Sequence, residues 1–147
     1  MSDEVRTWDS NEFSVTLGSL SVESGRGGGT FFSLEPIAED WTDTVGADGE
    51  VTRSKVNNGG ATVKLTVMRS SQAHKDLHAL RALDLASTNG AGLWAFQARD
   101  RSNGLRYEAA KGWIKKAPTE AAAREASEVE WELRIGKYTV TDETAGA

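Results

Sequence analysis

Two histidines, His74 and His78, are the residues in this sequence whose type and spacing could hold a metal ion. They lie four positions apart in SSQAHKDLHALRALDLAS, where leucines recur at helical spacing, so both imidazoles would face one side of a helix. Lys75 follows His74 where the zinc-protease pattern requires a glutamate, and no third ligand follows at a typical spacing. We therefore interpret both histidines as surface or packing residues and predict no metal site and no cofactor.

The acidic residues are numerous enough for two of them to act as a catalytic acid and base. Glu128, Glu130 and Glu132 alternate along SEVEWELRI, a predicted strand, and so share the face that meets water. Catalytic carboxylates need unlike and partly buried environments, so we interpret these glutamates as a solvated acidic face. The sequence has no Gly-x-Ser-x-Gly motif, and its two histidines share one helix. We predict that the protein is not an enzyme.

The glycine run GRGGGT, residues 25–30, could suggest a phosphate-binding loop. Such loops bind phosphate through backbone N–H groups at the start of a following helix. Here the next segment, FFSLEPI, has the pattern of a strand, and no Gly-Lys-Ser/Thr motif occurs. The run therefore predicts a loop between two strands.

The composition fits one soluble globular domain. Hydrophobic residues make up 38% and charged residues 27% of the 147 residues, which argues against disorder. A net charge of −5 excludes a high-affinity nucleic-acid-binding protein, since such domains carry a basic surface. The absence of cysteine excludes disulfides, thiolate zinc sites and thiol catalysis. No apolar segment approaches the length that crosses a bilayer, and the acidic start MSDEVRTWDS is unlike a signal peptide.

Most of the sequence alternates between apolar and polar residues, which is the pattern of half-buried β-strands. EFSVTL, ATVKLTVM and EVEWELRI show it most clearly. LWAFQARD and RYEAAKGWIKK are joined across Asn103-Gly104, a hairpin signal. The segment around EAAARE predicts a loop or a short helix. The chain is therefore mainly antiparallel β.

One segment, residues 71–86, changes to helical spacing. A serine can cap its start, and Asn89-Gly90 follows its end. We predict a single domain over residues 1–147, with this helix laid on the β-structure and a loosely held tail at 139–147.

Residues 43–60, DTVGADGEVTRSKVNNGG, do not fit a core strand. Asp48-Gly49 is a hairpin signal. The arm after it has two mixed faces, with Val51, Arg53 and Lys55 on one and Thr52, Ser54 and Val56 on the other. A ribbon that is polar on both sides makes sense as an arm lying on neighbouring subunits. The residues predicted to make these contacts are Asp43, Val45, Asp48, Glu50, Arg53 and Lys55.

Long exposed strand edges are an aggregation hazard, and a closed barrel removes them. Joining sheets from several subunits into one barrel requires strands with one face on the core and the other on a watery lumen. EFSVTL and ATVKLTVM have this pattern, and their polar positions are the candidate lumen-facing residues: Glu12, Ser14, Thr16, Thr62, Lys64 and Thr66. A monomeric ligand-binding β-barrel would also show alternating strands and stays as an alternative.

A series of motifs then occurs in order along the chain: VGADGEVTRSKVNNGGATVKLTVM, a serine-started helix ending in LRALD, GLWAFQARD, AAKGWIKKAP and EVEWELRI. Over residues 12–140 this series resembles the tail tube proteins of contractile-tailed bacteriophages. VGADGEVTR is its most distinctive part, and GWIKK and Glu130-Trp131 reinforce it. The chain departs from the family pattern at GRGGGTFF, where an acidic turn is expected.

The resemblance implies two packed antiparallel β-sheets, as a β-sandwich or barrel, with one flanking α-helix. Six copies would form a ring whose inner strands make a continuous barrel, and rings would stack into a hollow tube. Residues 43–60 match the loop that reaches an adjacent ring. The implied partners are further copies, a sheath outside, and baseplate and tail terminator proteins at the ends.

In such a tube DNA passes through the lumen without specific binding, and no membrane is involved. The acidic balance of the chain fits this function, because cationic contacts would hold the phosphates. The implied location is the virion tail, after assembly in the cytoplasm of the host bacterium. A tube subunit of a tailocin or of a type VI secretion-like apparatus is the alternative.

Overall fold

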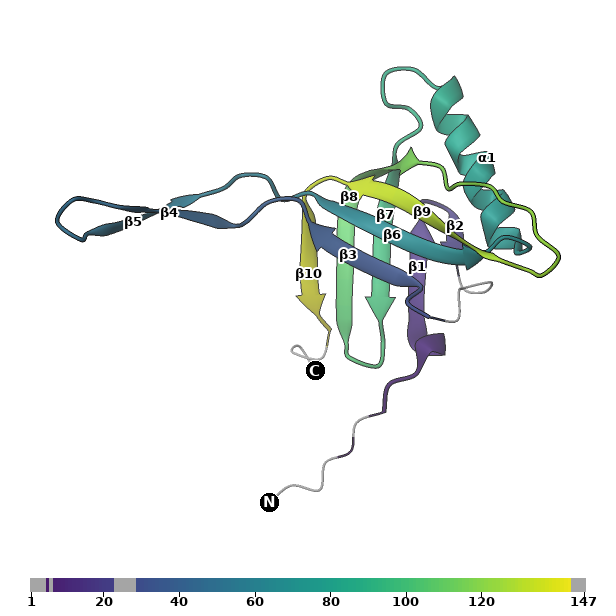
Figure 1. Ribbon diagram of the computed structural model, residues 1–147, viewed down its shortest axis with the longest axis horizontal. Helices are drawn as coiled ribbons and strands as arrows, with labels where there is room; N and C mark the ends of the chain where they lie inside the picture. The colour runs from purple at the N-terminus through teal and green to yellow at the C-terminus, as the bar shows by residue number, and fades with distance from the viewer. Residues whose placement is uncertain (1–4, 6, 23–28, 144–147) are drawn as a thin grey trace.

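The computed structural model describes residues 5, 7–22 and 29–143, which contain ten β-strands and one α-helix (Figure 1). Among these residues, no helix is both long enough and apolar enough to cross a bilayer. A 3-10 turn, Ser10–Glu12, precedes the first strand. The elements are β1 Phe13–Leu17, β2 Leu20–Val22, β3 Phe32–Pro36, β4 Trp41–Val45, β5 Val51–Lys55, β6 Ala61–Met68, α1 Gln72–Ala86, β7 Trp94–Asp100, β8 Leu105–Lys116, β9 Glu128–Ile135 and β10 Tyr138–Asp142.

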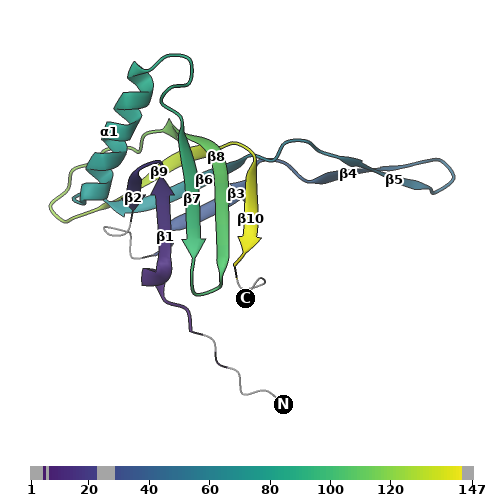
Figure 2. The same ribbon diagram turned by 180° about the vertical axis from the view of Figure 1, so that it is seen from behind.

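Eight strands form one sheet that folds over on itself at β8. Residues 105–109 of β8 pair with β7 and β10, whereas residues 112–116 pair with β9. The first layer is therefore β2-β1-β7-β8-β10 and the second layer is β8-β9-β6-β3, all antiparallel. In Figures 1 and 2 the strands of the two layers cross steeply. The predicted pair of packed antiparallel sheets with one helix is confirmed.

The inward side chains of both layers meet in a single core. Phe32 of β3 stacks on Phe96 of β7 with 6.3 Å between ring centroids, and it lies 4.9 Å from Phe13 of β1. These rings join the layers, because β3 belongs to one and β1 and β7 to the other. The largest fully buried side chains are Trp131, Phe96, Leu17, Leu65, Leu77, Leu133 and Ile135. The alternating pattern of the sequence therefore identifies the core face of β1, β6, β7 and β9.

Helix α1 begins where the sequence predicts. The Ser71 hydroxyl accepts the His74 backbone N–H at 3.3 Å and caps the first turn. After the helix, Asn89 and Gly90 adopt positive φ angles of 56° and 73° and turn the chain back. The predicted range 71–86 is correct to within one residue. Ala73, His74 and Leu77 are the buried side of the helix.

The C-terminal prediction needs correction, because residues 139–142 are not a loose tail. They belong to β10, in which Thr139, Val140 and Thr141 stand opposite Glu108, Tyr107 and Arg106 of β8. The ladder holds this segment although its residues are mostly polar. Residues 144–147, and residues 25–28 of the glycine run, lie outside the described residues. The segment around EAAARE is a loop without helix or strand.

Candidate functional site

The strands β4 and β5 form a two-stranded ribbon, residues 41–55, that projects from the body (Figures 1 and 2). Every residue from 39 to 55 is exposed. The predicted turn at Asp48-Gly49 is confirmed: Gly49 has a φ of 86°, and the Gly46 N–H donates to the Glu50 carbonyl oxygen at 2.7 Å. The ribbon is thus a regular hairpin that buries neither face within its own chain.

The two faces of the ribbon differ in chemistry. Directly opposite residues share a face, so one face carries Trp41 with Lys55, Asp43 with Arg53, and Val45 with Val51. The Arg53 guanidinium lies 3.9 Å from the centre of the Trp41 ring. The other face carries only hydroxyl side chains: Thr42, Thr44, Thr52 and Ser54. Four of the six predicted contact residues, Asp43, Val45, Arg53 and Lys55, therefore share the first of these faces. The other two, Asp48 and Glu50, lie at the tip of the ribbon.

The six candidate lumen residues do not come together. Ser14 and Thr16 lie on β1, on the outward face of the first layer, and Glu12 precedes that strand. Thr62, Lys64 and Thr66 lie on β6, on the outward face of the second layer. Because the two layers share one core, these faces point in opposite directions. A single bore can therefore be lined by only one of the two sets.

Charged side chains lie on both outward faces. On the second layer, Lys64 stands opposite Glu132 and lies 4.0 Å from Glu130. Lys116 of β8 also stands opposite Glu132, and Arg134 lies on the same face of β9. On the first layer, Arg99 pairs with Glu143 at 2.6 Å, and Arg106 pairs with Glu108. Both layers therefore carry basic side chains among acidic ones, and the glutamates predicted to share one face of β9 lie on the outward face of the second layer.

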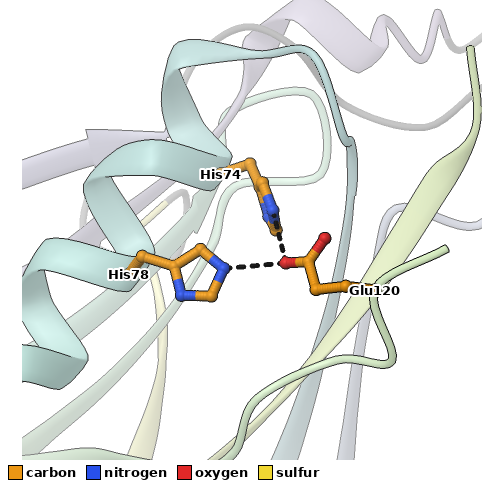
Figure 3. A group of neighbouring side chains, drawn as sticks. All are labelled: His74, His78 and Glu120. Atoms are coloured by element: carbon orange, nitrogen blue, oxygen red, sulfur yellow. Dashed lines mark hydrogen bonds and ion pairs between the residues drawn. The ribbon is translucent and has the colours of Figure 1, made fainter. Parts of the chain in front are cut away.

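A cluster of polar side chains, His74, His78 and Glu120, joins α1 to the loop before β9 (Figure 3). The Nε2 atoms of His74 and His78 lie 2.9 and 2.8 Å from the same Glu120 oxygen, Oε1. Arg69 donates to the other oxygen of Glu120 at 2.9 Å. These bonds, first that of His78 and then that of Arg69, lower the pKa of Glu120 from its ordinary 4.5 to about 2. The cluster therefore holds Glu120 as a carboxylate.

The ligand atoms of His74, His78 and Glu120 lie close enough together to hold a metal ion. The hydrogen bond that His74 accepts, however, leaves it in the wrong tautomer for a metal ligand. The buried Trp131 indole N–H, which can only donate, points at Nδ1 of His74 at 3.1 Å. His74 must therefore keep its own proton on Nε2, the atom that faces Glu120. A metal-binding histidine needs the opposite arrangement, with its second nitrogen donating. We interpret the cluster as a hydrogen-bonded tie between the loop and the helix.

Sequence reasoning missed Glu120, which lies 42 residues after His78. No ligand spacing links the two positions, since the contact depends on how the 117–127 loop returns across α1. The one sequence signal for Glu120 was the prediction of a loop or short helix around EAAARE, which begins at this residue. The histidines' role as packing residues stays a prediction for His78, whereas His74 is buried in the core.

Three solved structures are similar to this chain at low sequence identity. An anti-feeding prophage cap, the tube terminating cap, aligns with a TM-score of 0.61 at 12% identity and covers 97% of this chain and 95% of its own. The sheath-tube complex of the PVC extracellular contractile injection system in the extended state gives 0.58 at 10% identity, with 92% of each chain covered. Its sheath/tube terminator in the extended state gives 0.57 at 12% identity, with 95% and 99% covered. These likenesses confirm the fold.

No curated protein sequence matches the chain at a significant level. The model of the bacteriophage PhiTE tail tube protein family, however, matches residues 12–141, nearly the whole described chain. The strands β1 to β9, the helix and the projecting ribbon lie within the match, as does β10 except for its last residue. The chain therefore belongs to the bacteriophage PhiTE tail tube protein family, and it is a structural tail tube protein.

Proposed function

We propose that this chain is a non-enzymatic virion protein whose copies form hexameric rings, and that the rings stack into the hollow tube of a contractile tail. The tube is the conduit for DNA ejection into the host. The observation that carries the proposal is the ribbon, a regular hairpin exposed on both faces. Val45 and Val51 are 66% and 62% exposed at its end, so an isolated copy leaves them unburied.

The second layer is the better candidate for the wall of the bore. Its strands β3 and β6 run directly into the ribbon, and in Figure 1 the ribbon continues their direction. Barrel strands run along the barrel axis with a tilt, so this layer would send the ribbon along the tube towards the next ring. Thr62, Lys64 and Thr66 would then face the lumen with the β9 glutamates. Glu12, Ser14 and Thr16 would face outwards.

A lumen whose basic residues lie beside glutamates suits the passage of DNA. Each cationic contact with a phosphate adds affinity and slows sliding, whereas carboxylates keep a layer of water against the polyanion. Lys64 is flanked by Glu130 and Glu132, which offset its attraction for phosphate. DNA would therefore pass without specific binding.

The proposed partners of the tube are inferred from the similar solved structures. The similar structures carry the descriptions sheath-tube complex, tube terminator and tube terminating cap. By analogy we place a sheath protein around this tube and terminator and baseplate proteins at its ends. Assembly in the cytoplasm of the host bacterium would precede incorporation into the virion.

Electron microscopy of the purified protein tests the proposal. The expected particles are rings of six copies and stacked tubes with a central bore. A species that stays monomeric at high concentration, and that also fails to join assembled tails, would refute it.

A second candidate is a tube of a tailocin or other injection system, which delivers no genome. The similarity to two injection-system chains and a prophage cap favours it specifically. The neighbouring genes separate the two: capsid and terminase genes accompany a phage tail, and their absence indicates an injection system. A monomeric ligand-binding barrel has no such support, because the inward faces are filled by the core.

A further inference from the structure

A groove of about 400 Å³ lies where the ribbon joins the body. One wall is the base of the ribbon, and the other is β10. The residues that bear on its chemistry are Asp40, Lys55, Asn58, Lys137, Tyr138 and Val140. The groove is thus formed between the base of the ribbon and the chain that runs from the β9–β10 bend into β10.

This region has features of an unoccupied interface. In the described chain, β10 pairs with β8 and with no other strand. The Tyr138 N–H on its other edge donates to the Gly59 carbonyl oxygen, and beyond Tyr138 that edge stays open. Val140 on the same strand is 52% exposed, and Ile37 beside Gly60 is also exposed. Open edges with apolar side chains are normally covered in a stable assembly. Something apolar is therefore expected to lie here.

The charges at the two ends of the ribbon are complementary. The tip carries Asp48 and Glu50, and the groove carries Lys55 and Lys137 together with Asp40. Within the described residues, no ion pair involves either tip carboxylate or either groove lysine. These four charges are thus available to each other between copies.

The tip also carries the apolar pair Val45 and Val51, which are opposite each other on one face. A pair of β-branched side chains matches in size and polarity Val140, which lines the groove, and Ile37, which lies beside the groove residue Gly60. Tip and groove are therefore complementary in both of the properties that a docking contact uses.

We propose that the ribbon tip of one copy docks in the groove at the ribbon base of a second copy. The inference rests on the proposed stacking function and names the surface that receives the ribbon. A copy cannot fill its own groove, because tip and groove lie at opposite ends of a regular five-pair hairpin. The contact joins two different surfaces, so it is heterologous and continues from copy to copy. Repeated docking would connect successive rings along the tube.

Charge reversal tests the contact by rescue. Glu50→Lys at the tip and Lys137→Glu in the groove should each raise the protein concentration needed for tube formation by about tenfold. Both changes in one chain should return the protein concentration needed for tube formation to within about threefold of the wild-type value, because every contact regains opposite charges. Asp48 is left intact, since its Oδ1 accepts the Glu50 N–H in the turn. Lys75→Glu, exposed on α1, is the matched control and should have no effect.

Cysteine cross-linking tests the geometry, since the chain has no cysteine of its own. Ala47→Cys at the tip and Asn58→Cys in the groove, in one chain, should give a ladder of covalent multimers after oxidation of assembled tubes. Each single variant should give no product beyond a dimer. The pair Ala47→Cys with Lys75→Cys, whose second site lies on α1, should give no ladder.

The outcomes separate this inference from the proposed function. Absence of tubes from the wild-type protein would refute the function and the docking together. Wild-type tubes with no rescue by the double reversal, or with no ladder from the tip and groove pair, would overturn the docking alone. The ribbon would then contact another surface of the adjacent ring.

Discussion

Trp131 donates its buried indole N–H to Nδ1 of His74 across 3.1 Å. Because that nitrogen accepts, the proton of a neutral His74 must lie on Nε2, where it is donated to Glu120. One bond in the core therefore determines how the exposed side of the cluster is protonated.

Replacing Trp131 with phenylalanine should destabilise the protein and change the cluster. Loss of the N–H and of ring volume should lower the free energy of unfolding by about 2–4 kcal/mol. Nδ1 of His74 can then take the proton, and Nε2 becomes free to bind a metal. Urea unfolding measures the first effect, and calorimetric titration with Zn²⁺ measures the second. Micromolar zinc binding by the wild-type protein would contradict this account, and Trp113→Phe, at a half-buried ring, is the control.

Glu120 should make stability depend on pH under acidic conditions. Its pKa falls from 4.5 to about 2 on folding, chiefly through the bond from His78, so folding favours the carboxylate. The resulting stabilisation is complete above about pH 5 and is lost as the pH falls towards 2. Glu120→Gln should therefore flatten this part of the stability curve, as followed by urea midpoints at several pH values. Glu125→Gln, in the same loop, should leave the curve unchanged.

Shortening the ribbon should separate assembly from folding. With residues 42–54 replaced by a two-residue Asn-Gly turn, the body should lose less than about 1 kcal/mol of stability, because the removed residues are exposed. Tube formation should disappear. Thermal melting and electron microscopy of the same sample provide the two measurements. Tubes that still form at the wild-type concentration would show that the ribbon does not stack the rings.

Two threonines at comparable positions can identify the wall of the bore. Thr66 of β6 and Thr16 of β1 are both partly buried on outward faces, but on different layers. In assembled tubes, Thr66→Cys should react with a small maleimide and resist a bulky polymer-linked one. Thr16→Cys should react with both, if no sheath is present. The reverse pattern would place the first layer around the lumen.

Gly112 should be intolerant of even one methyl group. It lies at the bend of β8, where an added Cβ would come 2.7 Å from Cζ3 of Trp94 and 3.2 Å from Cγ2 of Ile135. Both neighbours are in the core, so Gly112→Ala should cost about 1–3 kcal/mol through overpacking. Gly29→Ala, with no atom within 4 Å of the added carbon, is the matched control. Equal stability of the two variants would show that the bend relaxes freely.

The amino-acid sequence by itself determined the elements whose signals are local. The alternation of apolar and polar residues predicted the inward side chains of β1, β6 and β9, because successive side chains of a strand point to opposite faces. Ser71, Asp48-Gly49 and Asn103-Gly104 marked a cap and two turns, since caps and turns depend on neighbouring residues. The exposed ribbon followed from the absence of an apolar face.

Only the tertiary structure decided the relationships between distant segments. It separated Thr16 from Thr66 on opposite layers, brought Glu120 to His78, and paired β10 with β8 where the sequence predicted a loose tail. The physical reason is that alternation shows which side of a strand is buried but not which strand it pairs with. Pairing and layer order depend on the bend at β8 and on the packing of one shared core, and neither is encoded in a local pattern.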